Sequence, residues 1–84
     1  MKKHWETTFK GHTIRVENSW FGGERLIVNG ELQDERTGFC LRSTLWGRIR
    51  AEDDKEKRIK VGIGGWFFVN CRIFVDDALV FSGS

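Results

Sequence analysis

The chain contains no proline, only two cysteines and no long apolar run, and its charges nearly cancel. A helix that crosses a bilayer needs about 18 or more consecutive apolar residues, and no such run occurs. The start, "MKKHWETTFKGH", has two lysines with no apolar segment after them, which is not the pattern of a secretory signal. We therefore expect a cytoplasmic protein with no membrane partner.

The overall charge is too small to attract a nucleic acid by itself. Fourteen Lys and Arg residues stand against twelve Asp and Glu, for a formal net charge of +2. The electric field of the whole molecule is correspondingly weak. Any surface that binds an anionic partner must therefore be a local cluster of basic side chains.

The two cysteines, Cys40 and Cys71, do not form a recognisable metal motif. Zinc fingers place their cysteines about two to four residues apart, and neither cysteine has such a neighbour. His4 and His12 could complete a set of four ligands only in a formal sense. Each cysteine lies in an apolar alternating stretch, where a free thiol packs as a small hydrophobic side chain. We predict no metal and no cofactor.

Aromatic residues and glycines are plentiful. Four Trp and seven Phe occur in 84 residues, so large rings must fill much of the small core. A chain of this size buries only somewhat more than about 60% of its unfolded surface, which is enough for one domain over residues 1–84. Ten glycines divide the chain into segments, most of which alternate between polar and apolar residues, as strands do.

These segments predict an all-β antiparallel sandwich or squashed barrel of seven to eight short strands joined by hairpins. The pair Asn29-Gly30 is a strong signal for a type I′ hairpin turn, because both residues tolerate positive φ. The acidic and lysine-rich "EDDKEK", residues 52–57, reads as a solvated hairpin loop. The expected strands cover residues 4–10, 12–18, 24–28, 31–36, 39–51, 58–65, 66–75 and 78–81.

Two of these strands have unusual faces. Residues 39–51 place apolar side chains such as Leu45 and Ile49 on one face, and Cys40, Arg42, Thr44, Trp46, Arg48 and Arg50 on the other. Residues 66–75 are largely apolar on both faces, which predicts either a central strand or a strand with one face in a binding surface.

Two short segments share a pattern. "IVNGEL" (residues 27–32) and "FVDDAL" (residues 74–79) both run from an apolar residue through Val and Asn or Asp to a turn residue and Leu. A match of six residues can arise by chance. If it reflects structure, two hairpins of similar geometry belong to one sandwich or barrel.

The stretch "HTIRVENSWFGGERLIVNGELQDE", residues 12–35, resembles the repeating hairpins of the Fas apoptotic inhibitory molecule family. Each of these hairpins begins with a strand of charged and apolar residues that ends in a glycine turn. A basic residue and an apolar run containing Val come next. Asn or Asp with Gly then follows, and Lys or Glu ends the pattern. "RIFVDDALVF" (residues 72–81) repeats the end of this pattern. The family is a non-enzymatic β-sandwich that acts through protein contacts, so the resemblance implies an interaction module without catalytic residues. The chain departs from the family in its shortness and in the pair Trp20-Phe21.

The sequence shows no clear catalytic motif. No sharp turn presents Cys40 or Cys71 beside His12, as an activated thiol would require. The glycines of "VGIGG" are not followed by Lys-Ser/Thr or by a helix, so a bend or bulge is a better interpretation than a phosphate-binding loop. We predict that the protein is not an enzyme.

The first hypothesis for function is a small interaction module that contacts a protein partner or a second copy of itself, as in a homodimer. Exposed aromatic residues often supply binding energy, and glycines free the backbone beside them. Trp20 and Phe21 stand against Gly22-Gly23, and these aromatics either plug the open end of the sandwich or anchor a partner. The predicted contact residues are Trp20, Phe21, Trp66 and Phe68.

The alternative is binding of single-stranded nucleic acid or another polyanion. If residues 44–51 and 57–63 pair symmetrically about Asp54, Arg48 lies opposite Lys60 and Arg50 opposite Arg58. Like charges in such pairs are destabilising, unless solvent, carboxylates such as Glu52 or Glu56, or an anionic partner offsets them. An aromatic ring such as that of Trp46, with arginines beside it, resembles the surfaces on which proteins stack the bases of single-stranded nucleic acid. The long basic side chains could instead simply cover the ring. The candidate residues are Arg42, Trp46, Arg48, Arg50, Arg58 and Lys60.

Overall fold

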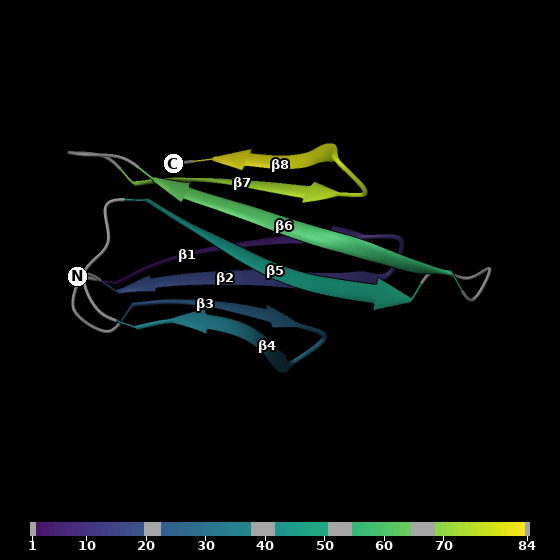
Figure 1. Ribbon diagram of the computed structural model, residues 1–84, viewed down its shortest axis with the longest axis horizontal. Helices are drawn as coiled ribbons and strands as arrows, with labels where there is room; N and C mark the ends of the chain where they lie inside the picture. Colours follow the sequence, from purple (N-terminus) through teal and green to yellow (C-terminus); the bar gives the residue numbers. More distant parts are fainter. Residues whose placement is uncertain (1, 20–22, 38–41, 51–54, 65–68, 84) are drawn as a thin grey trace.

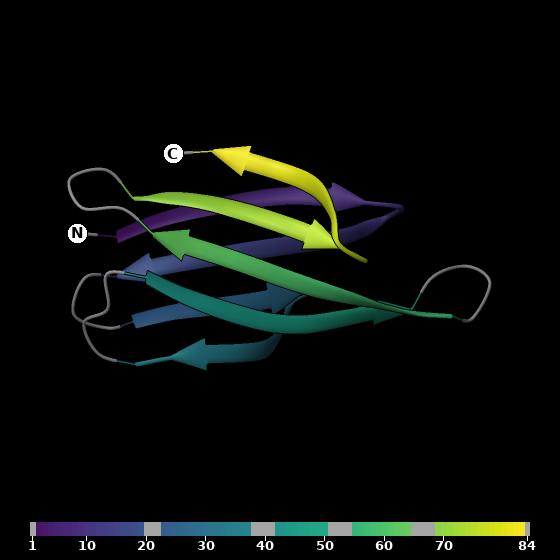
Figure 2. The same cartoon turned by 45° about the horizontal axis from the view of Figure 1, so that its top comes forward.

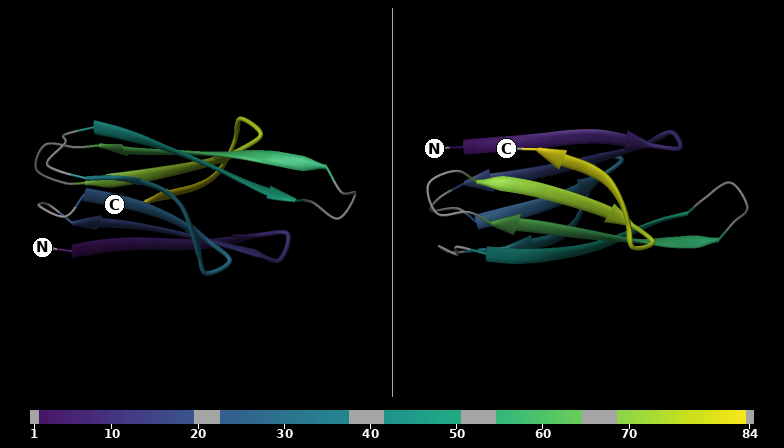
Figure 3. Two further views of the ribbon diagram at one scale, coloured as in Figure 1. Left: turned by 60° about the horizontal axis from the view of Figure 1, so that its bottom comes forward. Right: turned by 90° about the horizontal axis from the view of Figure 1, so that it is seen from above.

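A computed structural model gives the fold, and it describes residues 2–19, 23–37, 42–50, 55–64 and 69–83. Two antiparallel four-stranded sheets lie face to face and form the two layers seen in Figure 3. The all-β sandwich of hairpin-linked strands predicted from the sequence is confirmed, and Figure 1 labels its strands. The first sheet contains, in spatial order, β1 (Lys2–Phe9), β2 (His12–Ser19), β3 (Gly23–Val28) and β4 (Glu31–Arg36). The second contains β5 (Arg42–Arg50), β6 (Glu56–Gly64), β7 (Asn70–Val75) and β8 (Ala78–Gly83).

The core lies between the two sheets and is built by alternation along the strands. Every second residue of β2, β6 and β7 is buried, because successive side chains of a strand point to opposite faces. The strands of the two sheets cross at a shallow angle, as Figure 2 shows, so their inner side chains can interdigitate. The buried apolar residues are Trp5, Ile14, Val16, Leu26, Val28, Leu45, Ile49, Ile59, Val61, Ile63, Cys71, Ile73 and Val75.

The two sheets repeat one hairpin design. Asn29 has positive φ, donates its backbone N–H to the carbonyl of Thr13 at 2.9 Å, and accepts the Thr13 N–H on Oδ1 at 3.0 Å. Asp76 also has positive φ and makes the same two bonds to Arg58, at 2.9 and 3.0 Å. In each sheet a register shift comes two residues before that turn. The similarity of "IVNGEL" and "FVDDAL" is therefore structural, and the strands of the first half, residues 2–36, correspond in order to those of the second, residues 42–83.

The edge of β5 is covered by side chains of β4. The side-chain amide of Gln33 accepts the Arg48 N–H at 2.7 Å and donates to the Arg48 carbonyl at 2.9 Å. Asp34 accepts the N–H of Trp46 at 2.8 Å. Gly47 leaves room for this contact, since a Cβ there would lie 2.5 Å from Oε1 of Gln33. Backbone groups of β5 that would otherwise be available to another strand are thus bonded within the chain.

The predicted loop at residues 52–57 is too long. Glu56 and Lys57 belong to β6, where they pair with Arg50 and Ile49. A sequence rich in charge looks like a loop, yet the outward side chains of a strand are equally charged when that face meets water. No helix in the part of the chain described here is long and apolar enough to cross a membrane.

Candidate nucleic-acid interface

Three strands of the second sheet carry basic and aromatic side chains on their outer face. Alternation places Leu45, Val61 and Ile73 in the core, so their neighbours in the sequence point outward. We call this surface the basic face. It comprises Thr44, Trp46 and Arg48 of β5, Arg58, Lys60 and Gly62 of β6, and Arg72 and Phe74 of β7.

The centre of the basic face is a row that crosses the sheet. Trp46 pairs with Lys60, Lys60 pairs with Phe74, and Phe74 pairs with Leu79. Trp46 is 47% exposed. The ammonium of Lys60 lies 5.7 Å from the centre of the Trp46 ring and 6.0 Å from that of the Phe74 ring. One cation therefore lies between two partly exposed aromatic rings, within the distance at which cation–π attraction acts.

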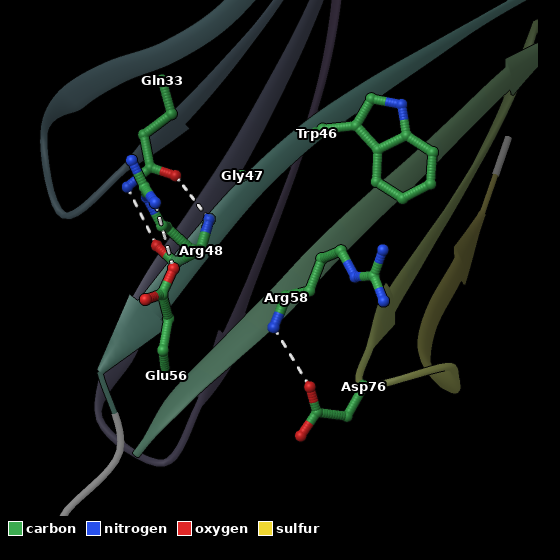
Figure 4. A pocket seen from close by; sticks show the side chains of 7 residues that line it. All are labelled: Gln33, Trp46, Gly47, Arg48, Glu56, Arg58 and Asp76. Carbon is green, nitrogen blue, oxygen red and sulfur yellow. Dashed lines mark hydrogen bonds and ion pairs between the residues drawn. The ribbon is translucent and has the colours of Figure 1, made fainter. Parts of the chain in front are cut away.

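Arg58 adds a second cation beside Trp46. Its guanidinium carbon is 5.8 Å from the ring centre. In Figure 4 the indole extends from β5 toward β6, with the guanidinium of Arg58 beside it. The long basic side chains flank Trp46 and still leave almost half of it open to solvent. The interpretation that they simply cover this ring therefore accounts for only part of its surface.

The register expected for β5 and β6 is wrong. Each residue of β5 pairs with a partner two positions earlier than expected, so Arg48 lies opposite Arg58 and Arg50 opposite Glu56. A shift of two residues keeps every side chain on its face, so the alternation in the sequence fits either register. The observed register brings Glu56 into the ladder.

One pair of like charges remains in this register. Arg48 and Arg58 are directly opposed, and Glu56 offsets the repulsion because it binds Arg48 at 3.2 Å. Glu56 is one of the two carboxylates expected from the sequence to do so, and the other, Glu52, lies outside the described residues. The pocket drawn in Figure 4 is lined by Gln33, Trp46, Gly47, Arg48, Glu56, Arg58 and Asp76.

Asp76 lies at the border of the basic face and is held as a carboxylate. The backbone N–H of Arg58 is the main cause that lowers the pKa of Asp76, and the side chain of Lys57 at 3.3 Å adds to it. Burial opposes this shift only in part. Asp76 is bonded to Lys57 and to the Arg58 backbone, and the charge of the Arg58 side chain also lowers its pKa, so this carboxylate offsets part of the Arg58 charge at the border of the basic face.

The outer face of the first sheet serves as an internal comparison. The corresponding row there runs Glu6, Arg15, Ile27 and Leu32. Arg15 binds Glu6 at 3.4 Å and Glu17 at 3.0 Å, which raises the pKa of its guanidinium, and Arg25 binds Glu35 at 3.3 Å. Both arginines on the outer face of β2 and β3 are therefore paired with carboxylates. On the basic face, by contrast, Arg58, Lys60 and Arg72 form no ion pair with any described residue.

Several predicted site residues cannot be placed on this surface. Trp20, Phe21, Trp66 and Phe68 all lie outside the described residues, so their role as partner contacts stays a prediction. Arg42 is described only by its backbone, which pairs with Gly64. Arg50 is exposed at the far end of β5, beyond Arg48.

Four members of the basic face, Thr44, Gly62, Arg72 and Phe74, were not among the sequence-predicted site residues. Alternation could have placed Arg72 and Phe74 on one face of their strand. Only the pairing of β6 with β7 shows that this face continues the one that carries Trp46.

Two buried titratable side chains among the described residues, Cys71 and Glu24, have raised pKa values. Burial raises the pKa of the Cys71 thiol to about 12, which removes the thiolate needed for nucleophilic attack. Burial also raises the pKa of Glu24, and Asn18, Ser43 and Arg36 oppose only part of this shift. No three His, Cys, Asp or Glu side chains gather as a metal site would require within the described ranges.

Comparison with known proteins assigns the chain to no family. No family model, no curated protein and no solved structure matches the chain.

Proposed function

We propose that this protein is a non-enzymatic binding module whose basic face holds single-stranded nucleic acid. The observation that supports the proposal most strongly is the row Trp46, Lys60 and Phe74, in which a cation without an ionic partner among the described residues lies between two partly exposed rings. Proteins that bind single strands combine these same elements, a positive surface for the backbone and aromatic side chains for the bases.

Stacking favours a single strand over a duplex. Neighbouring strands of a sheet lie about 4.8 Å apart, so Trp46 and Phe74, two strands apart, are separated by about 10 Å. The rings can stack only on bases whose faces are free, and the faces in a duplex are already stacked. Such contacts tolerate any base, so we expect little sequence preference.

The distribution of charge favours an anionic partner over a neutral one. Arg58, Lys60 and Arg72 form a patch of three cations on the basic face, whereas Arg15 and Arg25 on the outer face of the first sheet are paired with glutamates. Since the two halves share one design, this contrast arises from the side chains and not from the fold. A net charge of +2 is then compatible with a strongly basic local surface.

The proposal is tested by fluorescence anisotropy with a short labelled oligothymidylate. Affinity should fall steeply between about 50 and about 200 mM salt, because each neutralised phosphate releases counterions. Arg72→Ala and Arg25→Ala form a matched pair, since both remove one positive charge at equivalent positions of the two sheets. Arg72→Ala should weaken binding and reduce the slope of log K against log salt by about 0.7, whereas Arg25→Ala should change neither.

An affinity that does not respond to salt would contradict the proposal. Equal effects of the two arginine variants would also contradict it, because binding would then depend on total charge and not on the basic face.

A further inference from the structure

The outer face of the second sheet has a shallow hollow beside the row of rings. It is lined by Arg36, Ser43, Thr44, Lys60, Gly62, Ile63, Gly64, Asn70, Arg72 and Phe74, and its volume is about 740 Å³. We propose that this hollow is the seat of one nucleotide, with the base above Gly62 and the phosphate beside Lys60 and Arg72. The inference rests on the proposed function and names the place where a base is held.

Gly62 provides the floor of the seat. It pairs with Thr44 on one side and Arg72 on the other, in the middle of the sheet, and it has no side chain to fill the space above. A Cβ built at this position would meet no atom of the other described residues within 4 Å, its two chain neighbours aside. A glycine in the interior of a strand weakens it and often marks a place where a ligand or another backbone comes close.

The walls of the hollow supply the groups that a nucleotide needs. Phe74 presents an aromatic ring next to the floor, and the hollow has three cations, Arg36, Lys60 and Arg72. Carboxylates are absent from its described lining. Thr44 and Asn70 add a hydroxyl and an amide, which can donate to or accept from the edge of a base. The combination fits an anionic ligand with a flat, polar-edged ring.

The first sheet shows what the same position looks like without this role. The residue that corresponds to Gly62 is Glu17, which lies opposite His4 and Arg25. Its carboxylate binds Arg15, so side chain and charge both occupy the site. The second half has glycine in place of this acid and leaves Lys60, the counterpart of Arg15, without an ionic partner among the described residues.

The test is to fill the seat without changing the charge. Gly62→Val adds a branched side chain that strands accommodate well, at a position where its Cβ meets no other described residue within 4 Å beyond its chain neighbours. The variant should keep its fold by circular dichroism and bind oligothymidylate about tenfold more weakly, as expected for the loss of one stacked base. Thr8→Val, at an exposed position of β1, is the control and should bind like the wild type.

A second variant keeps the test informative if Gly62→Val does not fold. Asn70→Ala removes the amide from the rim of the hollow at an exposed position and should weaken binding several-fold. An abasic oligonucleotide of the same length should bind the wild type more weakly than oligothymidylate does, and Gly62→Val should not weaken its binding further.

The outcomes separate the two proposals. Salt-dependent binding by the wild type together with unchanged binding by folded Gly62→Val, or by Asn70→Ala, would overturn the nucleotide seat and leave the proposed function in place. Equal binding of abasic and normal strands would have the same meaning. A wild-type protein that binds no oligonucleotide at low salt would overturn both.

Discussion

The side chain of Gln33 takes the place of a neighbouring strand for Arg48. Its amide oxygen accepts the Arg48 N–H at 2.7 Å, and its amide nitrogen donates to the Arg48 carbonyl at 2.9 Å. A residue in a ladder offers its neighbour the same pair of bonds. The contact joins the edge strands of the two sheets and holds β5, which carries Trp46, against the first sheet.

We predict that Gln33→Ala destabilises the protein by about 1–3 kcal/mol, because two hydrogen bonds are lost and each contributes about 0.5–1.5 kcal/mol. Urea unfolding followed by tryptophan fluorescence measures this change. The variant also exposes backbone groups of β5, so its solutions should aggregate more readily. A variant as stable and as resistant to aggregation as the wild type would show that the bond pair is unimportant.

Asp76 should make stability depend on pH in the acid range. Its pKa in the folded protein is lowered from the ordinary 3.8, so its contribution is complete above that value and disappears as the pH falls through the folded pKa. Asp76→Asn keeps an oxygen that can accept the Arg58 N–H, as Asn29 does for Thr13. Melting temperatures between about pH 5 and pH 2 should therefore fall more for the wild type than for Asp76→Asn. Parallel curves would refute the role of this carboxylate.

Glu24 should give stability the opposite dependence on pH. It is 3% exposed, its Oε1 accepts from Asn18 at 3.3 Å, and Oε2 has no hydrogen-bond partner among the described residues. Its raised pKa means that the neutral form is favoured in the fold, so stability is lost as the pH rises above 4.5 and through the folded pKa. Glu24→Gln should lack this loss and become the more stable protein at neutral pH. The comparison uses melting temperatures across the same range, and a less stable Glu24→Gln at neutral pH would contradict the expectation.

Cys71 should be inert in the folded protein. The residue is fully buried, and the pKa of its thiol is about 12. In a Cys40→Ser variant, a thiol reagent at about pH 8 should modify Cys71 only as fast as the protein opens. Rapid, complete labelling under native conditions would show that the second sheet admits solvent to its inner face.

The strands and the tight hairpins could be predicted from the sequence because their signals are local. Alternation placed Leu45 and Ile49 on one apolar face, which lies in the core, and the Asn29-Gly30 pair correctly indicated a turn with positive φ. Short segments of this kind carry their own information. No distant residue is needed to interpret them.

The surface could be predicted only in part, because it depends on which strands are neighbours and in what register. Trp46 and Lys60 were correctly placed among the outward residues, but alternation does not distinguish registers that differ by two residues. The bonds from Gln33 to Arg48 and the alignment of Phe74 with Trp46 depend on how the sheets and strands meet. Such contacts leave no local pattern in the sequence.

The central claim, that the basic face holds a single strand, is tested most directly by a two-dimensional ¹H–¹⁵N NMR titration with oligothymidylate at low salt. The amides of Trp46, Lys60 and Arg72 should shift progressively, while those of Arg15 and Arg25 on the first sheet should stay in place. Unchanged spectra, or shifts confined to β1–β4 or to residues 20–22 and 65–68, would contradict the account.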